Sequence, residues 1–234
     1  MSERYTTLVN LKTKKAIFID QKKVRLHRMQ RRIRHLATIL NTQEVQKNFY
    51  LVMLTLTYAP GKEWEAGHIR EFMLGLRKYA GNALLGYAWV AELQERGAVH
   101  YHVMCWFHKG FFVACPDKNG LWTHGMTRRE TVRTPFYLTK YTGKEKQKDF
   151  DKFPKGIRVF SVWVSDVALK TDLRFMSLKL WEQQYVLSDG WESLSFWRKF
   201  EKSQSGWIAW GFRGSEEEAI EDIRQWEAVF ALGA

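Results

Sequence analysis

Short runs of apolar residues, bounded by turn-forming residues, predict β-strands in the middle of the chain. One run spans residues 50–58 and stops at Pro60, and another spans residues 157–163. Between them, residues 86–107 hold two apolar runs on either side of a polar turn at residues 95–97, which is typical of a β-hairpin. Four strands are therefore expected in this region.

A different spacing, with apolar residues three or four apart, predicts the helices between these strands. The first helix covers about residues 66–80 and ends at Gly81, and the second starts near Pro135. Residues 108–133, which precede the second helix, are rich in turn-forming pairs and are expected to be a loop. The order β-α-β-β-α-β is that of a ferredoxin-like or RRM-like fold, an α+β class with a central antiparallel sheet.

The N-terminal region combines helical spacing with a dense positive charge. Apolar residues predict an amphipathic helix at about residues 22–46, and residues 12–34 carry ten Lys or Arg against one acid, Asp20. Two interpretations stay open for this helix: an electrostatic contact with nucleic-acid phosphates, or a solvated charged face on a packed helix. The residues that would make the contact are Arg25, Arg28, Arg31 and Arg32.

The residues after 164 carry no chemical motif that we can name. They predict a helix at about 169–184, a short strand at 207–212 and a last helix that begins with a capping box at 215–218. We therefore expect three segments along the chain: a basic helical segment at 1–48, a central α+β domain at 49–164, and a helical extension at 165–234.

Composition narrows the class of partner and the compartment. A formal net charge of +12 and a pI of about 9.7 favour nucleic acid as a partner over a surface that is basic for solubility alone. Cys105 and Cys115 are too few and too poorly spaced for a zinc finger or a disulfide framework, which suits a reducing compartment. The chain lacks a membrane-spanning run and a signal-peptide pattern, so we expect a soluble protein of the cytoplasm without a membrane partner.

Within the predicted hairpin, two histidines and one carboxylate are expected on one face of the sheet. His100 and His102 are two residues apart on a strand, and a turn centred on Gly97 would place Glu92 across the ladder from His102. Two imidazoles and a carboxylate often hold a divalent metal, including the Fe(II) of an oxygenase. A histidine pair of this kind also occurs in purely structural roles.

A second cluster lies on the predicted helix after Pro135. Tyr137 and Tyr141 are four residues apart and are expected on one helix face, and Lys140 and Lys144 each follow a tyrosine by three residues. The tyrosines could pack into the core while the lysines reach solvent. Alternatively, a tyrosine hydroxyl attacks a phosphodiester and a neighbouring lysine offsets the negative charge.

Taken in order, three motifs resemble those of the HUH-type rolling-circle replication initiators. They are Leu-Thr-Leu-Thr at 54–57, His-Tyr-His at 100–102, and the doubled Y-x-x-K pattern at 137–144, which is similar to the two-tyrosine form found in phages. The resemblance covers about residues 50–163. Tyr101 departs mildly from the family, which usually keeps an aliphatic or aromatic residue there.

The resemblance implies an endonuclease that nicks single-stranded origin DNA, leaves a 5′-phosphotyrosine and a free 3′-hydroxyl, and later rejoins the strand. It implies Mg²⁺ or Mn²⁺ held by His100, His102 and Glu92, with Gln94 as the alternative third ligand. The implied nucleophiles and their supporting lysines are Tyr137, Tyr141, Lys140 and Lys144.

Alternatives within this resemblance are a transposase, a plasmid relaxase, or a DNA-binding protein that keeps the fold without the chemistry. The chain lacks the G-x-x-x-x-G-K-[ST] phosphate loop of an ATP-driven helicase. We therefore expect it to depend on a separate host helicase, in the bacterial cytoplasm if a phage or plasmid encodes it.

Overall fold

The computed structural model describes residues 5–10, 15–94, 96–142, 152–194 and 207–211. By its contacts the chain divides into two compact units. One joins residues 1–27 with residues 178–234, and the other comprises residues 28–177. Each unit is described by itself, and the predicted division at residues 48 and 164 stays a prediction.

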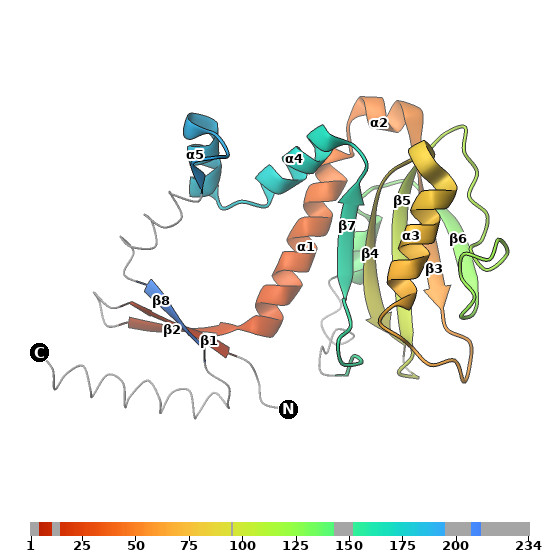
Figure 1. Ribbon diagram of the computed structural model, residues 1–234, viewed down its shortest axis with the longest axis horizontal. Coiled ribbons are helices and arrows are strands. Elements are labelled where there is room, and N and C mark those ends of the chain that lie inside the picture. The colour runs from red at the N-terminus through yellow and green to blue at the C-terminus, as the bar shows by residue number, and fades with distance from the viewer. Residues whose placement is uncertain (1–4, 11–14, 95, 143–151, 195–206, 212–234) are drawn as a thin grey trace, which may run out of the picture. The chain divides into compact units, whose positions relative to one another are not determined.

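The larger unit is built on a five-stranded antiparallel sheet, which confirms the predicted α+β class (Figure 1). In spatial order the strands are β6 (Thr127–Val132), β3 (Phe49–Thr57), β5 (Val99–His108), β4 (Leu84–Leu93) and β7 (Phe160–Val164). The arrangement is consistent with a ferredoxin-like fold. It differs from the double-stranded β-helix that the oxygenase interpretation requires.

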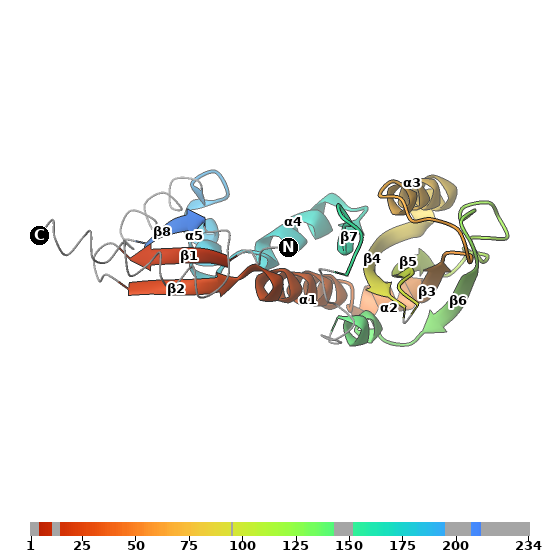
Figure 2. The ribbon, with the colours of Figure 1, turned by 90° about the horizontal axis from the view of Figure 1, so that it is seen from below.

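Helices cover both faces of this sheet, as Figure 2 shows. On one face, α3 (His68–Ala80) buries Ile69, Phe72 and Leu76 against alternate residues of the strands. On the other face lies the C-terminal half of α1 (Gln21–Ile39). Its residues Met29, Ile33 and Leu36 are fully buried, in the spacing that the sequence pattern predicts.

The smaller unit contains a three-stranded antiparallel sheet. Its strands, in spatial order, are β2 (Lys15–Asp20), β1 (Tyr5–Asn10) and β8 (Trp207–Gly211). Strand β8 confirms the short strand predicted at 207–212. The expectation that residues 1–48 are only helical is wrong, because residues 5–20 alternate in the strand period and pair with a strand from the far end of the chain.

Other element boundaries also differ from the prediction. The helix expected at 22–46 is two helices, α1 and α2 (Gln43–Asn48), because the Thr42 side chain caps a new start by accepting from the Val45 backbone amide. The helix expected at 169–184 is likewise two, α4 (Val167–Met176) and α5 (Leu180–Asp189), and Asp166 caps the first of them. The last predicted helix, which begins at 215–218, lies outside the described residues.

Strand β6 occupies part of the region expected to be a loop. Its sequence, Thr-Arg-Arg-Glu-Thr-Val, carries almost no apolar signal. It pairs only with β3, so it is an edge strand that needs no continuous apolar face. No helix in the described part of the chain is both long and apolar enough to cross a membrane.

Candidate active site

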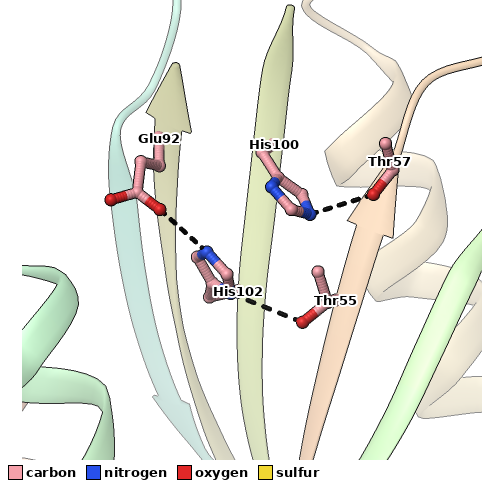
Figure 3. A network of polar contacts seen from close by, with 5 residues as sticks. All are labelled: Thr55, Thr57, Glu92, His100 and His102. Carbon is pink, nitrogen blue, oxygen red and sulfur yellow. Dashed lines mark hydrogen bonds and ion pairs between the residues drawn. The ribbon is translucent and has the colours of Figure 1, made fainter. Parts of the chain in front are cut away.

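The face of the sheet opposite α3 carries a row of polar side chains near the ends of three strands (Figure 3). The register pairs Thr55 of β3 with His102 of β5, and Thr57 with His100. Because side chains on alternate residues of a strand point to the same face, these four side chains lie together. Glu92 of β4, paired with His100, joins them.

The predicted partner of Glu92 is wrong by two residues. Glu92 lies directly opposite His100, not His102, because the hairpin turn is centred on Arg96 and not on Gly97. Moving the centre of a turn by one residue moves the partner by two and keeps the face unchanged. The Glu92 carboxylate still reaches His102 diagonally, with Oε2 lying 3.0 Å from Nε2.

Two threonines of β3 hold the imidazoles from the other side. Thr57 Oγ1 lies 2.9 Å from His100 Nε2, and Thr55 Oγ1 lies 3.4 Å from His102 Nδ1. Burial, followed by the neighbouring His102, lowers the pKa of His100 to about 4. The His100 imidazole is therefore neutral at pH 7 and keeps a nitrogen lone pair, which is the form that binds metals.

The donor set fits a divalent metal by its chemistry, since neutral imidazole nitrogens and a carboxylate are ordinary ligands of Mn²⁺. Among the described residues, however, no three His, Cys, Asp or Glu side chains are already arranged as a metal site. The direct hydrogen bond between Glu92 and His102 accounts for this, because it turns these two groups toward each other. A metal would have to replace that contact.

Gln94, the alternative third ligand, serves the turn. Its Oε1 accepts from Arg96 Nε at 3.0 Å, and Arg96 Nη2 donates to the Tyr58 carbonyl at 2.8 Å. Of the two candidates, the structure brings Glu92 to His102 and leaves Gln94 bonded within the hairpin turn.

The tyrosine segment is η2 (Tyr137–Tyr141), a 3₁₀ helix and not the α-helix that we expected. The Thr139 and Thr142 hydroxyls donate to carbonyls three residues earlier, at 2.6 and 2.7 Å, and so favour the tighter helix. In a 3₁₀ helix, side chains three apart are superposed. Lys140 Nζ accordingly lies 3.6 Å from the ring centroid of Tyr137, and 4.8 Å from that of Tyr141.

The two tyrosines differ in their distance from the histidines. The ring of Tyr141 stacks on that of His102, with centroids 3.8 Å apart and planes inclined by 20°. Tyr137 lies edge-on to Tyr141, with centroids 6.0 Å apart. Leu138, fully buried, anchors the segment against the sheet. The structure thus places Tyr141 at the histidines and Tyr137 one ring farther away.

Lys140 also acts on the charge of the tyrosines. Hydrogen bonding to Lys140, and then to Tyr141, lowers the pKa of Tyr137. Burial raises the pKa of Tyr141, and the hydrogen bond to Lys140 opposes this rise. The lysine therefore favours the phenolate form of both residues. Lys144, the second predicted support, lies outside the described residues.

The predicted DNA-binding arginines have different surroundings. Arg32 donates to Ser177 Oγ at 2.9 Å, so it is partly a structural residue. Arg28 and Arg31 are exposed. Arg25 belongs to the smaller unit, and burial lowers its pKa.

Two residues of this region escaped the sequence reasoning. Arg128 of β6 pairs with Thr55 and so shares the face of the histidines, but it could not be found without predicting β6. Tyr101, the middle residue of His-Tyr-His, points to the opposite face, where its fully buried hydroxyl accepts from Trp64 Nε1 at 2.7 Å. A tyrosine there is accommodated because the core supplies that polar partner.

Residues 51–146 match a family model of replication-associated proteins, the one described as Replication-associated protein ORF2. The matched span contains the threonines, the histidines, Glu92 and η2. No curated protein matches the chain, and no solved structure matches it. The family match supports a replication initiator, and with it a DNA partner.

Proposed function

We propose that this chain is an HUH-type replication initiator of the two-tyrosine form, which nicks and rejoins single-stranded origin DNA through a 5′-phosphotyrosine. The observation that carries the proposal is the stacking of Tyr141 on His102, with ring centroids 3.8 Å apart. It brings a nucleophile of phosphoryl transfer to the residues that have the chemistry of a metal site. Among enzymes with this chemistry, the family match favours an initiator over a transposase or a relaxase.

In the proposed reaction, Tyr141 Oη attacks the phosphorus of the scissile phosphodiester. The Oη–P bond forms as the bond from phosphorus to the 3′-oxygen breaks, and the phenol proton is lost while the 3′-oxygen gains one. His100, His102 and Glu92 would hold Mg²⁺ or Mn²⁺, which supplies Lewis-acid polarisation of the phosphate. Attack of a 3′-hydroxyl on the phosphotyrosine reverses the step and rejoins DNA.

The other side chains have roles that follow from their contacts. Thr55 and Thr57 orient the two imidazoles. Lys140 lies over both tyrosine rings and offsets the charge of the phenolate. Tyr137, held beside Tyr141, would make the second cleavage after one round of synthesis, and Lys144 would support it from beyond the described residues.

The proposal is tested by trapping the covalent intermediate. The purified protein is incubated with Mn²⁺ and labelled single-stranded oligonucleotides that tile the DNA around its own gene, and the products are separated on a denaturing gel. We expect a protein–DNA band that disappears in Tyr137→Phe/Tyr141→Phe. Tyr79→Phe is the matched control, since Tyr79 is exposed on α3 on the other face of the sheet.

Two outcomes would contradict the proposal. An adduct that persists in the double variant would mean that another residue is the nucleophile. Binding of the oligonucleotides with no adduct from any protein would favour a DNA-binding protein that keeps the fold without the chemistry.

A further inference from the structure

One flank of α1 carries positive charge that no acid offsets. Arg28, Arg31 and Arg34 are exposed, and none of the ion pairs found between described residues involves them. The charge is dense enough to act on a neighbour: burial lowers the pKa of His35, and Arg31, Arg32 and Arg34 lower it further. Uncompensated arginines of this density are typical of a surface that binds phosphates.

A hydrogen bond fixes which side of α1 is turned toward the tyrosines. Gln30 Nε2 donates to the Thr142 carbonyl at 3.1 Å, and Thr142 directly follows Tyr141. Figure 2 shows the short green η2 helix beside the C-terminal end of α1. Because residues four apart are neighbours on a helix, Arg34 lies on the same flank as Gln30.

The remaining arginines divide between this flank and the other. Each residue turns by about 100° around the helix axis, so Arg31 follows Gln30 next around the solvent side. Arg32 lies on the far flank, where it contacts Ser177. Arg31 and Arg34 are therefore the two exposed cations of α1 nearest to the tyrosine segment.

We propose that Arg31 and Arg34 bind the sugar–phosphate backbone of the single strand next to the scissile phosphate, so that α1 guides this strand at the tyrosines. The partner is single-stranded DNA, recognised through its phosphates and not its bases. The identity of the strand rests on the proposed function, whereas the binding requires no cleavage.

The test measures binding without chemistry. Full-length Tyr137→Phe/Tyr141→Phe protein is titrated onto a labelled single-stranded oligonucleotide in EDTA, by fluorescence anisotropy, at several KCl concentrations. Adding Arg31→Gln and Arg34→Gln should weaken binding and reduce the slope of log K against log[KCl] by about 1.4, since each phosphate contact to a single strand contributes about 0.7.

The matched control removes two charges from the opposite face of the sheet. Arg70→Gln/Lys78→Gln changes two exposed cations of α3 and should leave the slope nearly unchanged. Equal slopes for the two pairs of substitutions would overturn the proposal, because the effect would then come from net charge alone.

The two proposals can fail separately. With both tyrosines restored, Arg31→Gln/Arg34→Gln should raise the DNA concentration that half-saturates adduct formation and leave the maximal rate unchanged. If no protein forms an adduct but the slope falls as expected, the nuclease proposal fails and the arginine contact stands. If adduct forms and the slope does not fall, only the arginine contact is refuted.

Discussion

At the scale of single residues, the tyrosines are not equivalent. Tyr141 stacks on His102, whereas Tyr137 reaches the histidines only through Tyr141. The doubled Y-x-x-K pattern in the sequence treats the two alike. The asymmetry comes from the 3₁₀ geometry of η2 and from the burial of Leu138, which turn Tyr141 toward the sheet.

This asymmetry predicts different effects of the two single substitutions on the first cleavage. Tyr141→Phe should reduce the initial rate of adduct formation by about a thousandfold or more, as expected for loss of a nucleophile. Tyr137→Phe should retain most of it, because both replacements keep the aromatic ring and its packing. The measurement is the adduct formed in a single turnover on a denaturing gel, and the reverse order would assign the first cleavage to Tyr137.

Glu92 supports a second prediction at this scale. Glu92→Gln should lower the affinity for Mn²⁺ by about 10- to 100-fold, whether the carboxylate binds the metal or orients His102 through their 3.0 Å contact. Isothermal titration with MnCl₂ measures this affinity, and high Mn²⁺ should partly restore adduct formation. Glu63→Gln, at an exposed position remote in sequence from the strands, is the control. Unchanged affinity in Glu92→Gln would remove Glu92 from the site.

At the scale of elements, the loop at 122–126 supports the end of β3, where Thr57 holds His100. Trp122 Nε1 donates to the Thr57 carbonyl at 3.3 Å, and the Thr57 amide donates to the Met126 carbonyl at 3.0 Å. Gly125 lies so close to this strand that a Cβ there would collide with the Thr57 carbonyl and the Ala59 amide. The loop therefore needs glycine at this position.

Gly125→Ala should consequently lower the free energy of unfolding by about 1–3 kcal/mol, because backbone atoms and not a flexible side chain would have to move. Urea denaturation followed by circular dichroism measures the change. Gly110→Ala is the matched control, since a Cβ at Gly110 would meet only the His108 ring at 3.7 Å. Equal stabilities of the two variants would mean that the loop does not press on β3.

The same loop carries a pH-dependent contact with α3. The rings of His124 and His68 stack with centroids 3.6 Å apart. Burial lowers the pKa of His124 below 6.5; His68 and Lys62 lower it further, while Glu71 and Glu65 act in the opposite direction. The unfolded chain therefore binds a proton at this histidine before the folded chain does.

It follows that His124 contributes stability above about pH 6.5 that is lost as the pH falls from this value through its lowered pKa. We expect the urea midpoint to decrease between pH 7.5 and pH 5.5, and to decrease less in His124→Gln. The same decrease in both proteins would show that other groups, among them the buried His100, account for the whole effect.

At the scale of the molecule, the chain combines a formal net charge of +12 with a sheet whose polar face carries the candidate site. Its sequence lacks the phosphate loop of an ATP-driven motor. We propose that a separate helicase opens the duplex, and that this chain acts on the exposed single strand.

The purified protein should therefore fail to unwind a nicked duplex with ATP and Mg²⁺ in a strand-displacement assay. A helicase added from the host should restore unwinding, and the same duplex with a single-stranded region should form adduct without any helicase. Unwinding by the protein alone would contradict the prediction.

Much of the fold could be predicted because its signals are local. The alternation of apolar residues identified β3, β4, β5 and β7, and helical spacing identified α3 and α1. Strand β6 was missed, because an edge strand rich in arginine and threonine is stabilised by pairing with β3 and not by an apolar face of its own. Strands β1 and β2 were missed because the basic residues beside them suggested a helix.

Local sequence was sufficient to show which residues share a face: His100 with His102, and Thr55 with Thr57, because strand alternation depends only on neighbours along the chain. Packing in three dimensions was needed to show that Glu92 pairs with His100, that Tyr141 and not Tyr137 stacks on His102, and that Gln30 joins α1 to η2. These contacts depend on the centre of a turn and on packing between residues far apart in the chain. The spacing of residue types carries no record of either.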